Sequence, residues 1–243
     1  MEQVLPQGEA ISCQTLPRLG PAHTKRLRKL WSYGRPVHVA QLEGVDFDLQ
    51  VHGFLETMDS GYNAAAVLTL TKMGLAHLNE ARQKLIAAQR PHHELGQRLA
   101  AYLRAKGLHT WENVEFSNPH WAQPRSWSVV RPDVFACLPS LKAKSAAPAI
   151  YEVKVSRADF LADLAKPEKR LAYAALAEAV YYCCPEGLIC KEELPEGFGL
   201  LCEVTEGQFE LRKNARSAKG FELATDTAMT LMVKRQVPLG DQE

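Results

Sequence analysis

The sequence lacks any apolar run near the roughly 20 residues that a membrane-spanning helix needs, so we expect no membrane segment. Its opening, MEQVLPQGEAIS, has neither a basic region nor an apolar core, so we expect no signal peptide. The six cysteines form no CxxC pair and have no histidine at zinc spacing. A metal site at Cys183, Cys184 and Cys190 is disfavoured, because adjacent strand residues point to opposite faces. Buried, reduced thiols in a cytoplasmic protein are therefore expected.

Several catalytic motifs are also absent. There is no glycine-rich phosphate loop, no G-x-S-x-G and no H-E-x-x-H, so the chemistries of those motifs find little support. The 243 residues, 46% of them hydrophobic and 23% charged, are those of an ordinary globular protein with one large domain or two small ones.

Charge is distributed unevenly along the chain. Acidic residues are missing from Ala10 to Leu42, a stretch with six basic residues, whereas Glu186 to Glu210 holds seven glutamates and one lysine. The asymmetry favours an N-terminal surface that faces a polyanion, although a solvated basic face is the ordinary alternative. The candidate DNA contacts in this stretch are Lys25, Arg26, Arg28 and Lys29.

The N-terminal third divides into an arm and a small module. Residues 1–22 are polar and contain three prolines, which predicts a flexible arm. Residues 23–88 predict a helix, two further short helices in RPVHVAQLEG and DFDLQVHGFLETMDS, then a turn, a short strand and a helix that begins near Thr71. This order resembles a winged helix-turn-helix, in which a step such as LTKMG closes the wing.

The candidate recognition helix of this module is Phe47–Met58. It carries two acidic residues and only Gln50 and His52 as side chains suited to reading bases. The module can therefore contact DNA, or serve as a homodimer or protein-docking element, and both readings stay open.

Residues 89–235 predict a second domain, followed by a short tail at 236–243. An amphipathic helix after Pro91 ends at Gly107, and strands follow in VEFSN, WSVVRPDVFAC and AIYEVKV. A helix interrupted at Pro167, the strand AVYYCC, a hairpin about Glu206-Gly207 and a closing helix complete the domain. The order predicts an α/β (α+β) fold, a mixed sheet flanked by helices.

Three ionisable residues lie in the strands of this domain, where burial is costly: Asp133, Glu152 and Lys154. Side chains alternate along a strand, so Glu152 and Lys154 share a face, and Asp133 can lie at the same end of the neighbouring strand. Either the three neutralise one another, or they hold something from outside. Two carboxylates on adjacent strands suit Mg²⁺, and a lysine beside them suits hydrolysis of a phosphodiester.

Pro132-Asp133, followed by Glu152-Val153-Lys154, resembles the PD-(D/E)-x-K nuclease superfamily, whose sheet is restriction-endonuclease-like. The stretches SRADFLAD and YYCCPEGLI resemble a branch that includes DNA-repair and phage- or plasmid-borne endonucleases. The resemblance covers about residues 90–215. It implies that Asp133 and Glu152 hold Mg²⁺ or Mn²⁺ and that Lys154 is catalytic.

The resemblance also implies a supporting catalytic and metal-binding role for Glu94, although an acid at a helix start is favourable for dipole reasons alone. It implies DNA contacts at Ser156, Arg157, Lys169 and Tyr173. The alternatives are solvation for Lys169, core packing for Tyr173, and helix capping or pairing with Lys166 for Asp159 and Asp163. His92 and His93 precede the helix in an unremarkable loop, with DNA contact as the alternative.

The function expected from these residues is a metal-dependent DNA endonuclease in DNA repair or mobile-element biology. The alternative is a non-catalytic DNA-binding or regulatory protein on the same fold, because a fold does not fix an activity.

Overall fold

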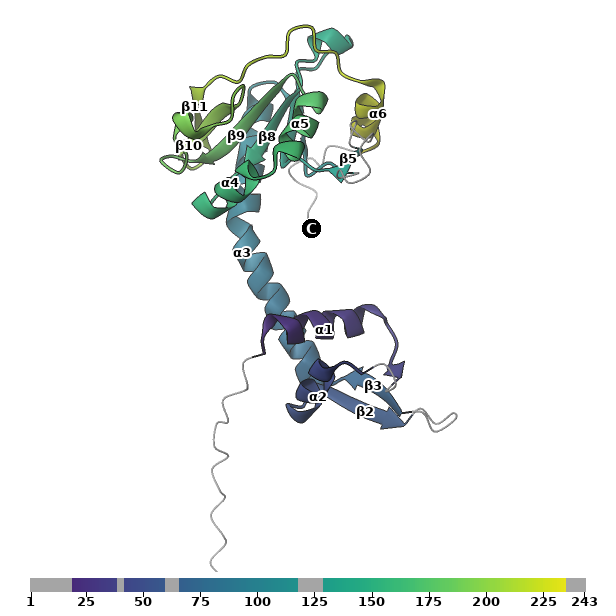
Figure 1. Ribbon diagram of the computed structural model, residues 1–243. Helices are drawn as coiled ribbons and strands as arrows, with labels where there is room; N and C mark the ends of the chain where they lie inside the picture. The colour runs from purple at the N-terminus through teal and green to yellow at the C-terminus, as the bar shows by residue number, and fades with distance from the viewer. Residues whose placement is uncertain (1–18, 39–41, 60–65, 118–128, 235–243) are drawn as a thin grey trace, which may run out of the picture. The chain divides into compact units, whose positions relative to one another are not determined.

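The computed structural model describes residues 19–38, 42–59, 66–117 and 129–234 (Figure 1). The chain divides into two compact units, Met1–Ala88 and Gln89–Glu243. The predicted fold class is confirmed: the first unit has a small sheet with helices, and the second a mixed sheet with helices. Most of the predicted arm and the whole tail at 236–243 lie outside the described residues. None of the described helices combines the length and apolar character that crossing a membrane requires.

The first unit packs two helices and the start of a third against a three-stranded antiparallel sheet of order β1-β3-β2. Its core is a cluster of six buried apolar side chains: Leu27, Leu30, Leu49, Phe54, Leu55 and Leu68. Its elements are α1 (Pro21–Ser32), β1 (Val37–His38), α2 (Gly44–Val51), β2 (Leu55–Asp59), β3 (Ala66–Leu70) and the beginning of α3 (Lys72–Ala105).

Two short helices predicted in this unit are wrong in part. The stretch predicted as the second helix contains strand β1, and the candidate recognition helix Phe47–Met58 ends at Val51. Gly53 adopts φ +72°, a left-handed conformation that ends a helix, and the chain then runs into strand β2. Burial of Phe54 and Leu55 holds that strand in place. The predicted strand and the helix beginning near Thr71 are confirmed.

Helix α3 continues through Pro91, where a new helix was predicted to begin. A proline in a helix interior costs about 3 kcal/mol because it removes a backbone hydrogen bond and crowds the preceding turn. Good helix formers before Pro91, and burial of Leu95, Leu99 and Leu103 after it, offset that cost. The helix ends where the sequence predicts, with Gly107 at φ +84° just beyond its last residue.

The second unit is built on a six-stranded sheet of order β11-β10-β9-β8-β7-β4. Strands β8, β9 and β10 run parallel, whereas β7, β4 and β11 are antiparallel to their neighbours, so the predicted mixed sheet is confirmed. The strand β4 was missed, because its four residues follow the helix-ending glycine directly. The strands are β4 (His109–Glu112), β5 (Phe116–Ser117), β6 (Val129–Val130), β7 (Val134–Cys137), β8 (Ala149–Val153), β9 (Ala179–Pro185), β10 (Gly199–Thr205) and β11 (Gln208–Lys213).

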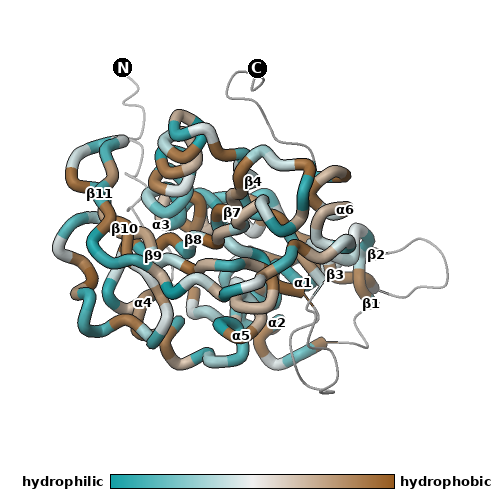
Figure 2. Tube along the Cα trace, turned by 90° about the horizontal axis from the view of Figure 1, so that it is seen from above, coloured by the Kyte–Doolittle hydropathy of each residue, from teal (hydrophilic) through white to brown (hydrophobic). Residues whose placement is uncertain are grey.

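Helices cover both faces of this sheet. The leucines of α3 pack on Tyr151 and Val153 of β8, and the alternation of hydrophobic and hydrophilic residues along α3 is visible in Figure 2. Ile150 faces the other layer, formed by α5 and α6, while α4 packs beside it on β9 and β10. Glu152 has the parity of Ile150, so it points toward α5. The helices are α4 (Arg157–Leu164), α5 (Pro167–Leu176) and α6 (Thr225–Val233).

The five cysteines within the described residues are free thiols, and four of the five are buried. Cys137, Cys183, Cys184 and Cys202 are buried free thiols, whereas Cys190 is exposed in the turn after β9. Cys13 lies outside the described residues.

Candidate active site

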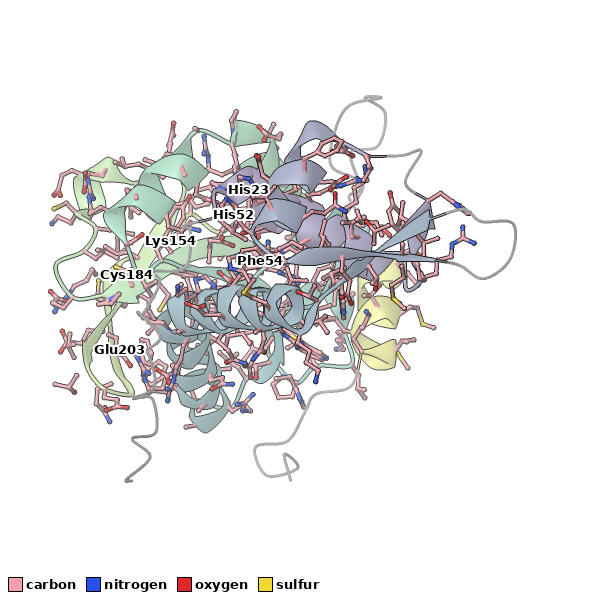
Figure 3. All side chains as sticks on the ribbon, turned by 90° about the horizontal axis from the view of Figure 1, so that it is seen from below. His23, His52, Phe54, Lys154, Cys184 and Glu203 are labelled. Carbon is pink, nitrogen blue, oxygen red and sulfur yellow. The ribbon has the colours of Figure 1, made fainter. Side chains whose placement is uncertain are left out.

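Strand β8 and the residue that follows it carry two charged side chains into the interior. Glu152 is 5% exposed and Lys154, labelled in Figure 3, is 3% exposed. The Lys154 Nζ donates to Glu152 Oε1 over 2.8 Å. The predicted same-face arrangement is therefore confirmed, and each charge has a partner that offsets part of the cost of burial.

Asp133 lies directly before β7, at the same end of the sheet. The pairing of Val134 with Tyr151 places the preceding residue, Asp133, across from Glu152. The backbone N–H of Val153 donates to Asp133 Oδ2 over 2.7 Å, which fixes that carboxylate against β8. The structure thus brings together the three residues of the predicted motif.

Helix α5 contributes two of the candidate DNA contacts, Lys169 and Tyr173, which lie four residues apart on one helical face. Lys169 Nζ donates to Glu152 Oε1 over 2.5 Å, and the Tyr173 hydroxyl donates to Glu152 Oε2 over 2.8 Å. Solvation of Lys169, the alternative reading, is contradicted by these contacts. Core packing holds for Tyr173, but its hydroxyl also binds the site carboxylate. Pro167 opens α5 as predicted, and so sets the position of both side chains.

Asp163 is a member of this site that the sequence did not reveal. We expected it to cap a helix or pair with Lys166, yet it is buried, with Oδ1 accepting from Lys169 over 2.9 Å and Oδ2 from the Tyr182 hydroxyl over 2.7 Å. Lys154 Nζ lies 3.6 Å from the same Oδ1. The available signal was its spacing from Phe160, since residues three apart share one face of a helix.

Burial and mutual charge shift the ionisation of this cluster. Burial, followed by the nearby Asp133 charge, raises the pKa of Glu152. Burial opposes the charged form of Lys154, but Glu152 outweighs it and raises the net pKa. Burial also opposes the charged form of Asp163, and the two lysines outweigh it, so its pKa is lowered. Burial, then the Glu152 charge, raises the pKa of Tyr173, which keeps its hydroxyl a hydrogen-bond donor at neutral pH.

His92 lies in helix α3, and not in the loop that was expected. Its Nε2 lies 3.0 Å from Asp133 Oδ1, and hydrogen bonding to that carboxylate raises the pKa of the imidazole. A pocket of about 70 Å³ opens beside this pair and is also lined by His93, Glu112 and Asn113. Asp133, with 15% of its side chain exposed, is therefore the carboxylate of the motif that borders the pocket.

Glu94, predicted as a supporting metal ligand, is placed elsewhere. Its carboxylate accepts from Arg90 Nε over 2.7 Å on an exposed part of α3. It does not line the pocket beside Asp133. The prediction is corrected: helical periodicity turns His92, two residues earlier, toward Asp133, and residues two apart do not share a helical face.

Ser156 and Arg157 lie where α4 begins, shortly after β8, and both serve local structure. The Ser156 hydroxyl caps α4 by accepting from the Asp159 N–H over 3.2 Å. Arg157 binds both carboxylate oxygens of Glu193, over 2.8 and 2.6 Å. The Arg157 side chain is still 44% exposed, and its ion pair with Glu193 partly neutralises its positive charge.

The basic candidates of the first unit separate into two kinds. Arg26 is buried and binds Asp46 with two hydrogen bonds of 2.8 and 2.7 Å, so its predicted DNA contact is corrected to an internal ion pair. Lys29 pairs with Glu43 over 3.2 Å at the surface. Lys25 and Arg28 are exposed on α1, as a contact with an outside partner requires.

The carboxylates of the site offer a divalent cation only part of the ligands that it needs. No group of three or more His, Cys, Asp and Glu side chains within the described ranges is arranged to hold a metal ion. The hydrogen bonds above leave about two acceptor positions on Asp133 and about one on Glu152, out of four per carboxylate. The pair thus fits a cation that keeps most of its water, as Mg²⁺ does, and does not fit a closed protein cage.

Comparison with known proteins finds similarity to one solved structure. No protein-family model matches this chain, and no curated protein does. Among solved structures, the chain is similar to SPO1766, a protein of unknown function from Silicibacter pomeroyi, with 25% identity and a TM-score of 0.43 over 59% of this chain and 82% of that one. At that TM-score the likeness carries no argument about fold or function.

Proposed function

We propose that this protein is a metal-dependent DNA endonuclease of the PD-(D/E)-x-K type. The observation that carries the proposal is the meeting of Asp133 and Glu152 across adjacent strands, with Lys154 bonded to Glu152. Mg²⁺ or Mn²⁺ would be held by Asp133, which borders a small pocket, and by the one acceptor position that remains on the buried Glu152. Lewis acidity and neutralisation of phosphate charge are what such a cation supplies when bound.

The chain's own residues have separate tasks in this proposal. Lys154 and Lys169 place two positive charges beside Glu152, where negative charge on a phosphodiester would be stabilised. Tyr173 and Asp163 keep those groups aligned, Tyr173 by donating to Glu152 and Asp163 by accepting from Lys169. The backbone N–H of Val153 orients Asp133.

The test is cleavage of labelled duplex, single-stranded and branched DNA in Mg²⁺ or Mn²⁺, with Asp133→Ala as the paired control. The proposal expects cleavage of at least one substrate that is lost in the control and on chelation of the metal. Equal cleavage by the wild type and the control would point to a contaminating nuclease. If the protein binds DNA but cleaves no substrate, the nuclease proposal is wrong and a role in DNA recognition remains.

The second candidate is a non-catalytic DNA-binding or regulatory protein on the same fold. It is favoured by the number of internal partners that Glu152 already has: Lys154, Lys169 and Tyr173. Such a network also stabilises a fold without any metal. The metal dependence of the cleavage assay separates the two candidates.

The cellular role proposed with this activity is DNA repair or mobile-element biology in the cytoplasm. Its support is the resemblance of the sequence around the motif and the reduced state of the described cysteines.

A further inference from the structure

A groove runs between α1 and α3 within the first unit, and neither its apolar nor its basic residues belong to the site above. Figure 1 shows α1 lying across α3. The groove has a volume of about 550 Å³ and is lined chiefly by Trp31, Leu75, Leu78, Leu85, Arg28 and Arg82. Trp31 is 61% exposed, and Leu75 and Leu85 are about half exposed, at 46% and 49%. Apolar side chains this large are seldom left facing water together without a partner.

The lining of α3 forms one stripe. Leu75, Leu78, Arg82 and Leu85 follow a spacing of three and four residues, so they share one face of the helix. At 1.5 Å per residue the stripe extends about 15 Å, which is long enough for the roughly 10.5 Å between anchors at i and i+7 on a docked helix.

The charges of the groove are of one sign. Among the described residues neither Arg28 nor Arg82 forms an ion pair, whereas Arg26 and Lys29 of the same helix α1 are both paired with carboxylates. The groove lining contains no carboxylate. The nearest acid along α3, Glu80, is paired with Lys84 over 2.6 Å.

These charges select the kind of occupant. A second copy docked face to face would bring four guanidinium groups into one interface with no carboxylate from the lining. A nucleic-acid backbone would neutralise the arginines but would leave the leucines against a polar surface. An amphipathic helix with acidic flanks satisfies both the apolar floor and the two arginines.

We propose that the α1–α3 groove is a docking site for an acidic amphipathic helix of a partner protein. Its apolar side chains lie on Trp31 and the leucines, and its carboxylates pair with Arg28 and Arg82. The proposal does not depend on the nuclease activity, because every lining residue belongs to the first unit.

The experiment uses the full chain and a fluorescein-labelled helical peptide of about 16 residues, with leucine at i, i+3, i+4 and i+7 and glutamate on its flanks. A peptide with lysine in place of glutamate, and a scrambled acidic peptide, are the controls. Fluorescence anisotropy should show saturable binding of the acidic peptide alone. Trp31→Ala and the pair Arg28→Glu/Arg82→Glu should each weaken it by roughly tenfold or more, and the charge-reversed pair should now bind the lysine peptide.

Lys25→Glu is the matched control, since Lys25 is exposed on α1 but does not line the groove. It should change the affinity by less than about threefold. All these positions are at the surface, and circular dichroism verifies that each variant is folded. Binding of the scrambled peptide with equal affinity, or no binding of the acidic one, would overturn the proposal. The proposal would also be overturned if the protein self-associates or binds DNA through the groove, as shown by loss of that association or binding in Trp31→Ala.

Discussion

Each of the two units buries a cluster of oppositely charged side chains, and the two clusters differ in how far solvent reaches them. In the first unit Arg26 binds Asp46 through two hydrogen bonds and Glu43 through a third, and the Glu43 N–H also donates to Asp46. Asp46 is wholly buried and Arg26 is 5% exposed, so this pair is closed to solvent, while Glu43 at its edge is half exposed. In the second unit Asp133 is partly exposed beside a small pocket.

The charge balance of the second cluster differs as well. Three carboxylates that are buried or nearly so, of Asp133, Glu152 and Asp163, face two lysines, and the half-exposed Asp159 lies 3.6 Å from Lys154. The cluster therefore has at least one more negative charge than its lysines balance. His92 can compensate part of that charge when it is protonated. An uneven, partly open cluster is what a cation-binding site requires, whereas a closed and fully paired one serves the fold.

The largest expected effect is at the closed cluster. Arg26→Ala should leave Asp46 buried without its cation and destabilise the first unit by about 3–5 kcal/mol. Denaturant unfolding followed by circular dichroism measures the loss. Lys25→Ala, an exposed neighbour on α1, is the control and should stay near wild type. A loss below about 1 kcal/mol would mean that the pair contributes little and that the comparison is wrong.

A smaller loss of stability is expected at Asp163. Asp163→Asn removes the charge that holds Lys169 and leaves one of two buried hydrogen bonds poorly made, for an expected cost of about 1–3 kcal/mol. Asp159→Asn is the comparison, because Asp159 lies one turn earlier, is 45% exposed and reaches the cluster only through Lys154, at 3.6 Å. Equal effects from the two changes would show that the buried contacts of Asp163 are unimportant.

Asp133 should behave in the opposite way to Arg26. Asp133→Asn keeps an acceptor for the Val153 N–H and removes the excess charge, so stability should stay within about 0.5 kcal/mol of wild type or rise. DNA cleavage should fall roughly a hundredfold or more. Paired unfolding and cleavage measurements check both statements. A large loss of stability with unchanged cleavage would make Asp133 a structural residue.

The smallest effect is a pH dependence at the surface. Hydrogen bonding from Arg157, then from the Cys190 N–H, lowers the pKa of Glu193 to about 2. A carboxyl with a lowered folded pKa adds stability above its ordinary pKa, near 4.5, and that stability is lost as the pH falls toward 2. Carbon NMR of the Glu193 carboxyl should show a low midpoint that returns toward 4.5 in Arg157→Ala. An unchanged midpoint would show that the ion pair with Arg157 does not lower the pKa of Glu193.

Sequence patterns predicted the sheet of the second unit well, because strand alternation and the glycines at 107 and 207 act locally. Short spacings also paired Glu152 with Lys154 on one strand face and Lys169 with Tyr173 on one helical face, while only the resemblance implied that this helix lies at the site.

The failures at Arg26 and Asp163 depended on tertiary structure. Arg26 belongs to a basic stretch, and only the packing of α1 on α2 shows that Asp46 compensates its charge. Asp163 looked like an ordinary helix acid until α4 was packed on the sheet beside Tyr182. Pro91 suggested a helix start, and helix propensity on both sides outweighed it.

The most direct test of the account is titration of the protein with Mn²⁺, followed by electron paramagnetic resonance, in the wild type and Asp133→Asn. If the excess carboxylate charge of the second unit holds a divalent cation, the wild type should bind Mn²⁺ at this site and Mg²⁺ should compete. Asp133→Asn should lose that binding while remaining as stable as wild type. Identical titrations of the two proteins, or no Mn²⁺ binding by either, would contradict a metal site at Asp133 and Glu152.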